Sequence, residues 1–301
     1  MRRARAAALA AAACAFLWGT PVASAAPLRV LASFLPMYIF TANVAAGAPG
    51  VVVDLMLPAA LGCPHDYALT PSDLRKIAAA DLFVANGAGM EEFLGAPVRK
   101  ANPRIRVVET AASIPLLRDS HGAGGGDGKH ADANPHTWVS PKNAILQVRA
   151  IEKALSEAVP GDSARFRANA DAYARRLEAL SLEFEEASRT FRRRNIATFH
   201  NVFDYLARDY GLTIVGEVET APGQEPSAGE IRKLVRTMRD RGVPALFTEP
   251  QYPGRIAEAI SREAGVPLRV LDPVATGSTA PGYYEETMRR NLRTLREALS
   301  R

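Results

Sequence analysis

Cysteine is almost absent from this chain, which has only Cys14 and Cys63 among its 301 residues. Cys14 lies in an N-terminal stretch that we interpret below as a signal peptide, so one thiol would remain after processing. A single thiol cannot form an intramolecular disulfide. The packing of the core must therefore stabilise the fold.

Long hydrophobic runs are missing as well. Residues 6–18 are apolar, follow three arginines and precede a small-residue cleavage site, so we predict that residues 1–25 form a secretory signal peptide. This run is too short to span a bilayer comfortably, and no later segment has the unbroken apolar length that is needed. A lipid anchor on Cys14 is the weaker alternative, because the three alanines before it are a poor signal. We expect an exported, periplasmic protein without direct insertion into the membrane.

Neither sign of charge dominates the chain. The formal net charge is +5, and removal of the three signal arginines leaves about 276 residues with a charge of +2. So small an excess predicts no binding to nucleic acid or to a membrane surface. The remaining length is sufficient for two compact lobes.

The usual motifs of hydrolases are also lacking. The chain has no HExxH sequence, no nucleophile elbow and no recognisable catalytic triad. Residues 123–130 are glycine-rich, but they lack the leading glycine of a phosphate loop, and His130 stands where Ser or Thr must hold magnesium. Residues 119–134, which contain this stretch, have no apolar period and are predicted to form a flexible surface loop.

What the chain does have is one long helical run, residues 162–194. Asp162 can cap its first turn, and three arginines crowd its last turn, where positive charge suits the helix dipole. Its apolar residues recur at steps of four and three, as a single stripe: Phe166, Ala170, Tyr173, Leu177, Leu180, Phe184, Ala187 and Phe191. At about 1.5 Å per residue the run is roughly 50 Å long. It fits half of a coiled coil or a strut across two lobes, and the globular-looking sequence on both sides favours the strut.

Strands alternate with helices on both sides of this run. The predicted strands are residues 28–34, 51–57, 81–86, 105–109, 196–199, 213–218, 245–248 and 268–271. The run 51–57 is almost continuously apolar, which is typical of a strand buried on both faces. Thr70, Ser140 and Ser227 stand before three of the helices as N-caps. The pattern predicts an α/β fold of two lobes, each a parallel sheet flanked by helices and joined by one long rigid helix. The boundaries are residues 26–160, 161–195 and 196–301.

Candidate metal-binding residues follow the predicted strands. In parallel α/β sheets, ligands bind beyond the carboxyl ends of strands. His65 follows strand 51–57, His200 ends strand 196–199, and His136 directly precedes a helix. Asp272 and Glu249 end two further strands. Three imidazoles with one or two carboxylates suit a tetrahedral zinc site, and contributions from both lobes would place the ion in the cleft between them.

Each of these residues also has a purely structural interpretation. A single histidine in a loop is more often exposed or paired than bound to a metal. Asp272 precedes Pro273 and could form a turn, and Glu249 could be an acceptor that orients the imidazole of a ligand. Cys63 is the only thiol after the signal, and a lone cysteine is more often a small buried residue than a zinc ligand. His121 and His130 lie in the flexible loop, either solvated or as a weak collector of metal ions.

The order of short motifs resembles the zinc and manganese receptors of ABC importers, which are exported solute-binding proteins. The resemblance covers essentially the whole chain after the signal. The motifs are Gly62-Cys63-Pro64-His65-Asp66-Tyr67, Thr70-Pro71-Ser72-Asp73, Asn134-Pro135-His136-Thr137-Trp138, Thr198-Phe199-His200-Asn201-Val202-Phe203-Asp204-Tyr205, Glu225-Pro226-Ser227, Thr248-Glu249-Pro250-Gln251 and Leu271-Asp272-Pro273. Each motif is weak alone, and together in this order they are specific.

The resemblance implies the metal ligands His65, His136, His200 and Asp272, and a monomeric receptor that passes its ion to a membrane permease. Zinc is favoured over manganese, or iron(II), because manganese receptors of this kind commonly carry Glu where His200 stands. Cys63 departs from the pattern, since the usual residue before Pro64 is acidic. The histidine-bearing loop is shorter and poorer in histidine than the collector loop of the zinc branch.

Two other classes of protein compete with this interpretation. An exported zinc hydrolase would keep one ligand position open for water and would need a general base, which Glu249 could supply if Asp272 is not a ligand. A receptor for a metal chelate or cobalamin would need a wide aromatic cleft. Only two tryptophans occur, and one of them is Trp18 in the signal.

Overall fold

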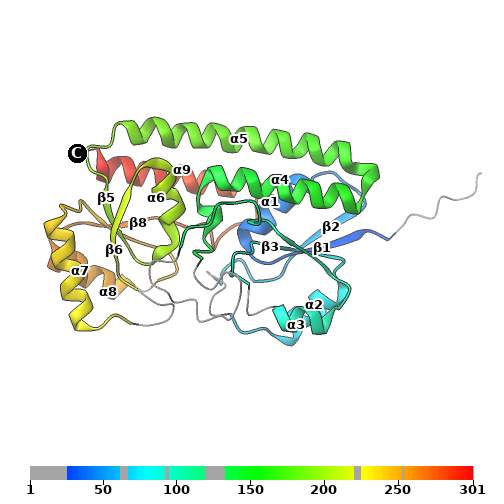
Figure 1. The fold of residues 1–301 in the computed structure, drawn as a ribbon, viewed down its shortest axis with the longest axis horizontal. Helices are drawn as coiled ribbons and strands as arrows, with labels where there is room; N and C mark the ends of the chain where they lie inside the picture. Colours follow the sequence, from blue (N-terminus) through cyan, green and yellow to red (C-terminus); the bar gives the residue numbers. More distant parts are fainter. Residues whose placement is uncertain are drawn as a thin grey trace, which may run out of the picture.

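The computed structural model describes residues 26–61, 67–91, 95–118, 133–219, 225–252 and 254–300. These residues form two parallel four-stranded sheets side by side, with the long helix α5 running across both of them (Figure 1). The predicted fold class is therefore confirmed. Within the described part of the chain, no helix is both long and apolar enough to cross a membrane.

The first sheet has the strand order β2-β1-β3-β4, with every neighbouring pair parallel. Its strands are β1 (Leu28–Ala32), β2 (Val51–Leu55), β3 (Leu82–Ala85) and β4 (Arg106–Glu109). The helices of this part of the chain are α1 (Leu35–Ala45), α2 (Pro71–Ala79), α3 (Gly95–Ala101) and α4 (Pro141–Ala158). A short 3₁₀ turn, η3 (Thr137–Val139), leads into α4.

The second sheet repeats the same topology, with the order β6-β5-β7-β8. Its strands are β5 (Asn195–Thr198), β6 (Thr213–Glu217), β7 (Leu246–Thr248) and β8 (Leu268–Val270). The accompanying helices are α6 (Asp204–Tyr210), α7 (Ala228–Asp240), α8 (Gly254–Ala264) and α9 (Tyr283–Leu299), and the 3₁₀ turn η5 (Asn201–Phe203) precedes α6. Because the strands of each sheet are parallel, the loops that follow them leave that sheet at one edge.

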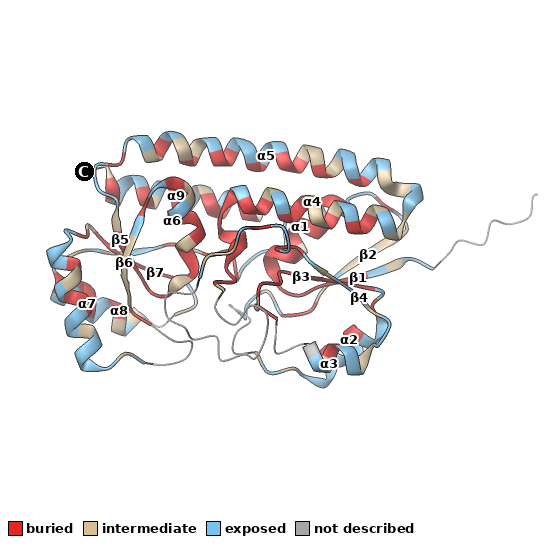
Figure 2. Cartoon of the chain, in the orientation of Figure 1, coloured by how far each residue is buried: buried red, intermediate tan, exposed pale blue. Residues whose placement is uncertain are grey.

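Helix α5 (Ser163–Arg189) buries the whole predicted apolar stripe up to Ala187. Its inner side is buried and its outer side exposed along the full length of the helix (Figure 2). The prediction that the helix continues to residue 194 is wrong. It ends where the backbone N–H of Thr190 bonds to the carbonyl of Ala187, and the N–H groups of Arg192 and Arg193 bond to the carbonyl of Leu299. Asp162 precedes the first turn without a side-chain cap.

Helix α5 is attached to elements of both halves of the chain. It packs against α4 and α1 of the first half and against α9 of the second. Asn169 donates to the carbonyls of Val44 and Ala46, at the end of α1. On the other side, Arg289 of α9 forms a forked ion pair with Glu183 of α5, with a closest approach of 2.8 Å. The strut is thus fixed to each lobe by packing and by hydrogen bonds.

Two local predictions fail. Residues 51–57 do not form a strand buried on both faces, because β2 is the edge strand of its sheet and Val52 is 42% exposed. Only Met56 and Leu57, after the strand, are fully buried. Ser140 precedes α4 but makes no cap, since its hydroxyl donates to Asp209 of α6 instead. Ser227 forms the predicted capping box with Glu230, and Thr70, at the predicted start of its helix, forms a second one with Asp73.

Candidate metal centre

The structure brings together two of the three candidate histidines. His200 follows β5 and directly precedes η5, and His136 directly precedes η3. Their ring centroids are 5.2 Å apart and their planes are inclined by 79°. Both side chains are buried, with 2% of His136 and 8% of His200 exposed. Two imidazoles from distant parts of the chain therefore lie next to each other, one just beyond β5 and the other just before η3.

The orientation of His200 is set by Glu249. Strands β5 and β7 are parallel neighbours, so the residues that follow them lie side by side. Glu249 Oε1 lies 2.5 Å from His200 Nδ1, and Glu249 Oε2 accepts a hydrogen bond of 2.7 Å from Gln251. When Glu249 is ionised it can only accept a hydrogen bond, and Nδ1 of His200 is then the protonated nitrogen, which leaves the lone pair on Nε2. Burial raises the pKa of Glu249, while the contacts with His200 and Gln251 act in the opposite direction.

The orientation of His136 is set by Asn134. Asn134 Oδ1 lies 2.9 Å from the Nδ1 of His136 and accepts a second hydrogen bond of 2.9 Å from its backbone N–H. Sequence reasoning assigns no role to Asn134. An available signal is the Asn-Pro-His order, because an Asn side chain often bonds the backbone two residues later.

Asp272 lies beyond the end of β8, in a loop that contacts the segment of His136. Trp138 Nε1 donates a hydrogen bond of 2.8 Å to the carbonyl of Pro273. Asp272 Oδ1 accepts from the N–H of Val274, which has a positive φ of 62°, so the carboxylate does form a turn. The Asn291 side chain bonds both the N–H and the carbonyl of Asp272. Burial raises the pKa of the Asp272 carboxyl group.

Comparison with known proteins shows to which family the chain belongs. The family model described as zinc-uptake complex component A, periplasmic (ZnuA), matches residues 30–298. The chain belongs to this family.

Two curated relatives show how much of each chain is covered by the similarity. The chain is 30% identical over 290 residues to the zinc-binding protein AdcA of Streptococcus pyogenes serotype M1, covering 89% of this chain and 55% of AdcA. It is 29% identical over 284 residues to the high-affinity zinc uptake system protein ZnuA of Bacillus subtilis (strain 168), covering 90% and 88%. The chain thus spans about half the length of AdcA and most of that ZnuA.

Solved structures share the whole fold. The solute-binding protein FpvC of Pseudomonas aeruginosa in complex with Mn²⁺ superimposes with a TM-score of 0.79 at 32% identity, over 91% of this chain and 98% of FpvC. A crystal structure of ZnuA gives a TM-score of 0.80 at 27% identity, over 91% and 100%. A receptor solved with Mn²⁺ and a ZnuA therefore share this architecture.

The ZnuA-family chain described here accounts for only part of the predicted ligand set. His136 and His200 are adjacent, Glu249 contacts His200, and the Asp272 loop contacts Trp138. The remaining predicted residues, His65, Cys63, His121 and His130, lie outside the described residues. Among the residues that the structure describes, no group of three or more His, Cys, Asp and Glu side chains is placed to hold a metal ion.

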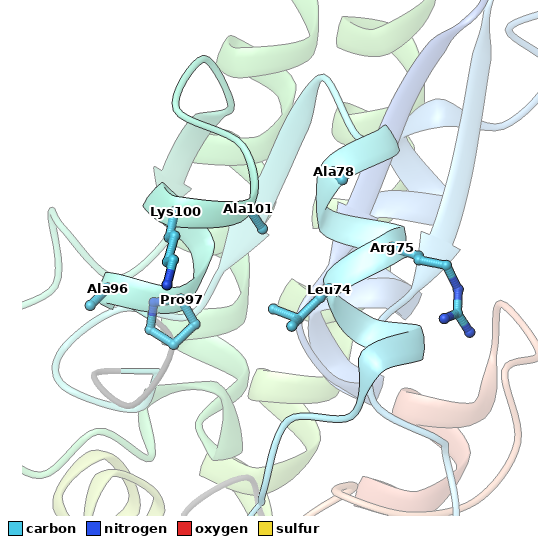
Figure 3. Close-up of a pocket in the computed structure, with 7 residues that line it drawn as sticks. All are labelled: Leu74, Arg75, Ala78, Ala96, Pro97, Lys100 and Ala101. Atoms are coloured by element: carbon cyan, nitrogen blue, oxygen red, sulfur yellow. The ribbon is translucent and has the colours of Figure 1, made fainter.

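A separate groove lies between α2 and α3, on the side of the first sheet opposite α5 (Figures 1 and 3). Its volume is about 640 Å³, and its lining consists of Leu74, Arg75, Ala78, Ala96, Pro97, Lys100 and Ala101. The lining contains no oxygen, sulfur or imidazole side chain that could bind a cation, and it has no aromatic residue. It is therefore distinct from the candidate metal centre.

Proposed function

We propose that this protein is the periplasmic receptor of a zinc importer, which binds Zn²⁺ between its two lobes and delivers the ion to an ABC-transporter permease. The observation that carries the proposal is the adjacent pair His136 and His200, in which the Nδ1 of each ring contacts an oxygen acceptor. Membership of the zinc-uptake family supports the same role.

The spacing of the two rings fits a shared tetrahedral ion. With each Nε2 about 2.0–2.1 Å from zinc, two imidazoles at a tetrahedral angle have ring centroids roughly 5 Å apart. The observed separation is 5.2 Å. Edge-to-face aromatic pairs also meet near a right angle at this spacing, so the distinguishing feature is that both Nδ1 atoms are turned toward oxygen acceptors.

We propose His65 and Asp272 as the remaining two ligands. The support for Asp272 is the hydrogen bond from Trp138 to Pro273, which holds the Asp272 loop against the segment of His136. The support for His65 is its position in the sequence after β2, whose carboxyl end lies at the same edge of the sheet as those of its parallel neighbours. Together with buried Glu249, Asp272 would offset the charge of a divalent cation.

Zinc is the proposed cargo, with manganese as the alternative. Three imidazoles favour the softer zinc ion, whereas manganese prefers oxygen ligands. The specific observation that keeps manganese in view is the structural relative FpvC, which was solved in complex with Mn²⁺. Metal content after purification from a medium containing both ions distinguishes them, and manganese retained against equimolar zinc would overturn the choice.

The geometry argues against an exported hydrolase. A hydrolase would need Glu249 as a general base, but both oxygens of this carboxylate are engaged, by His200 and by Gln251. Capture and release of an ion require no covalent step. The function that we propose is binding and hand-over alone.

Zinc titration of the metal-free protein tests the proposal. We expect one high-affinity site per chain, lost in His136→Ala and in His200→Ala. The matched controls are His121→Ala and His130→Ala, which make the same chemical change in the predicted loop and should leave the affinity of the main site unchanged. Tight one-site binding that persists in His200→Ala would contradict the proposed site.

A further inference from the structure

The side chain of Asn134 bonds the backbone N–H of His136, as in a turn, and it also contacts the His136 ring, Asn201 and Asp204. This side chain is fully buried and bonds at both ends. Resting on the proposed function, we propose that Asn134 is a positioning residue with two roles. It fixes the proton of His136 on Nδ1, and it joins the segment of His136 to the segment of His200 before any metal arrives.

The amide group of Asn134 can adopt only one orientation. Its Nδ2 donates to the carbonyl of Asn201 and to Oδ2 of Asp204, each at 2.8 Å. A flipped amide would direct Oδ1 at these two acceptors, so Oδ1 must face His136. Since Oδ1 only accepts, the Nδ1 of His136 must be the protonated nitrogen. The lone pair is then on Nε2, the nitrogen that a metal would use.

The same amide joins the two histidine segments. Asn201 is the residue after His200, and Asp204 begins α6. The backbone of Asn134 strengthens this link, because its carbonyl accepts a hydrogen bond of 2.7 Å from the hydroxyl of Tyr205 in α6. The spacing between the imidazoles is therefore set by protein contacts. Such preorganisation reduces the conformational entropy that the two side chains lose when the ion binds.

The first test removes the amide. In Asn134→Ala the zinc affinity should fall about 10–100-fold, the usual effect of losing a group that orients a metal ligand. ¹⁵N NMR of the imidazoles, on the metal-free protein at neutral pH, should show His136 as the Nδ1–H tautomer in the native chain and as a mixture in the variant. This second readout does not depend on metal binding.

A pair of substitutions distinguishes a role of Asn134 in positioning His136 from a general loosening of the fold. Asn134→Asp keeps the acceptor for His136 but places a carboxylate against Asp204, so affinity should fall. Combining it with Asp204→Asn supplies a new donor to that carboxylate and should restore most of the affinity. Asp240→Asn, the same chemical change at an exposed residue of α7, is the matched control, and its affinity should stay near native.

The outcomes separate the two proposals. If the native chain binds no zinc, the proposed function fails. If the native chain binds zinc tightly but Asn134→Ala has the same affinity and the same His136 tautomer, the positioning role is overturned while the function stands. A loss in Asn134→Asp that Asp204→Asn does not recover would also overturn it, by assigning the effect to a loosened fold.

Discussion

At the scale of single residues, the candidate centre consists of two imidazoles, and the Nδ1 of each contacts an oxygen of a buried side chain. Glu249 is 1% exposed and contacts His200, and Asn134 is fully buried and contacts His136. Neither partner is itself a proposed ligand. The affinity of the site should therefore depend on residues that never touch the ion.

We predict that Glu249→Gln weakens zinc binding by about 10–100-fold. Glutamine keeps an acceptor for the Nδ1–H of His200 but removes the negative charge that makes this imidazole more basic. The affinity is measured by competition with a chelator at fixed pH. Glu258→Gln, on the surface of α8, is the matched control and should bind like the native chain. Equal affinities for the two variants would contradict the role of Glu249.

Zinc binding should weaken between about pH 7.5 and about pH 5.5, because imidazoles must be neutral to bind a metal. Asp272 acts in the same direction. Burial raises its pKa, so as the pH falls this carboxyl group takes up a proton earlier than an exposed one and loses its negative charge. Titrations across this range check the slope. An affinity independent of pH would mean that histidines are not the ligands.

The sequence predicts which candidate residues lie together where a strand end fixes their position. His200 and Glu249 follow β5 and β7, which are neighbours, and the rule for carboxyl ends brings them together. Asn134 could not be assigned in this way, because its role depends on Asp204 and Asn201, whose positions only the folded chain reveals. The contact is between side chains far apart in sequence, and no periodicity encodes it.

At the scale of elements, patterns that depend on local chemistry are predicted well. Thr70 and Ser227 bond the backbone three residues later, so the start of each helix is visible in the sequence. The failures depend on distant contacts. Helix α5 stops at Arg189 because the following backbone bonds to Leu299, and Ser140 bonds Asp209 rather than its own helix.

Helix α5 offers a direct test of its apolar stripe. Leu180 is fully buried and Leu182, two positions later, is 57% exposed. Leu180→Ala should reduce the free energy of unfolding by about 2–5 kcal/mol, since it leaves a cavity in the core. Leu182→Ala, the matched control, should change it by no more than about 0.5 kcal/mol. Chemical denaturation measures both, and equal effects would contradict the assigned inner face.

At the scale of the whole molecule, several connections span the two lobes. Helix α5 packs on α4 and α9, α9 also contacts α1, and Asn134 joins the segment before η3 to α6. A hinge of loose strands between lobes could bend freely, but these connections would all have to break or slide together. We therefore expect the fold to resist bending across its long axis.

We predict that zinc binding moves the lobes by only a small rotation. The change on binding should be confined to the loops that carry the ligands, because a larger rotation would have to disrupt the packing of α5 on α4, α1 and α9. Crystal structures of the metal-free and zinc-loaded protein, superimposed on the first sheet, measure the rotation of the second. A rotation of tens of degrees would contradict the role of α5 as a rigid strut.

The most direct test of the central claim is an anomalous difference map from crystals of the zinc-loaded protein, collected on both sides of the zinc absorption edge. The account predicts one strong peak about 2.0–2.1 Å from Nε2 of both His136 and His200. A peak elsewhere, with these two nitrogens bound to no ion, would contradict it.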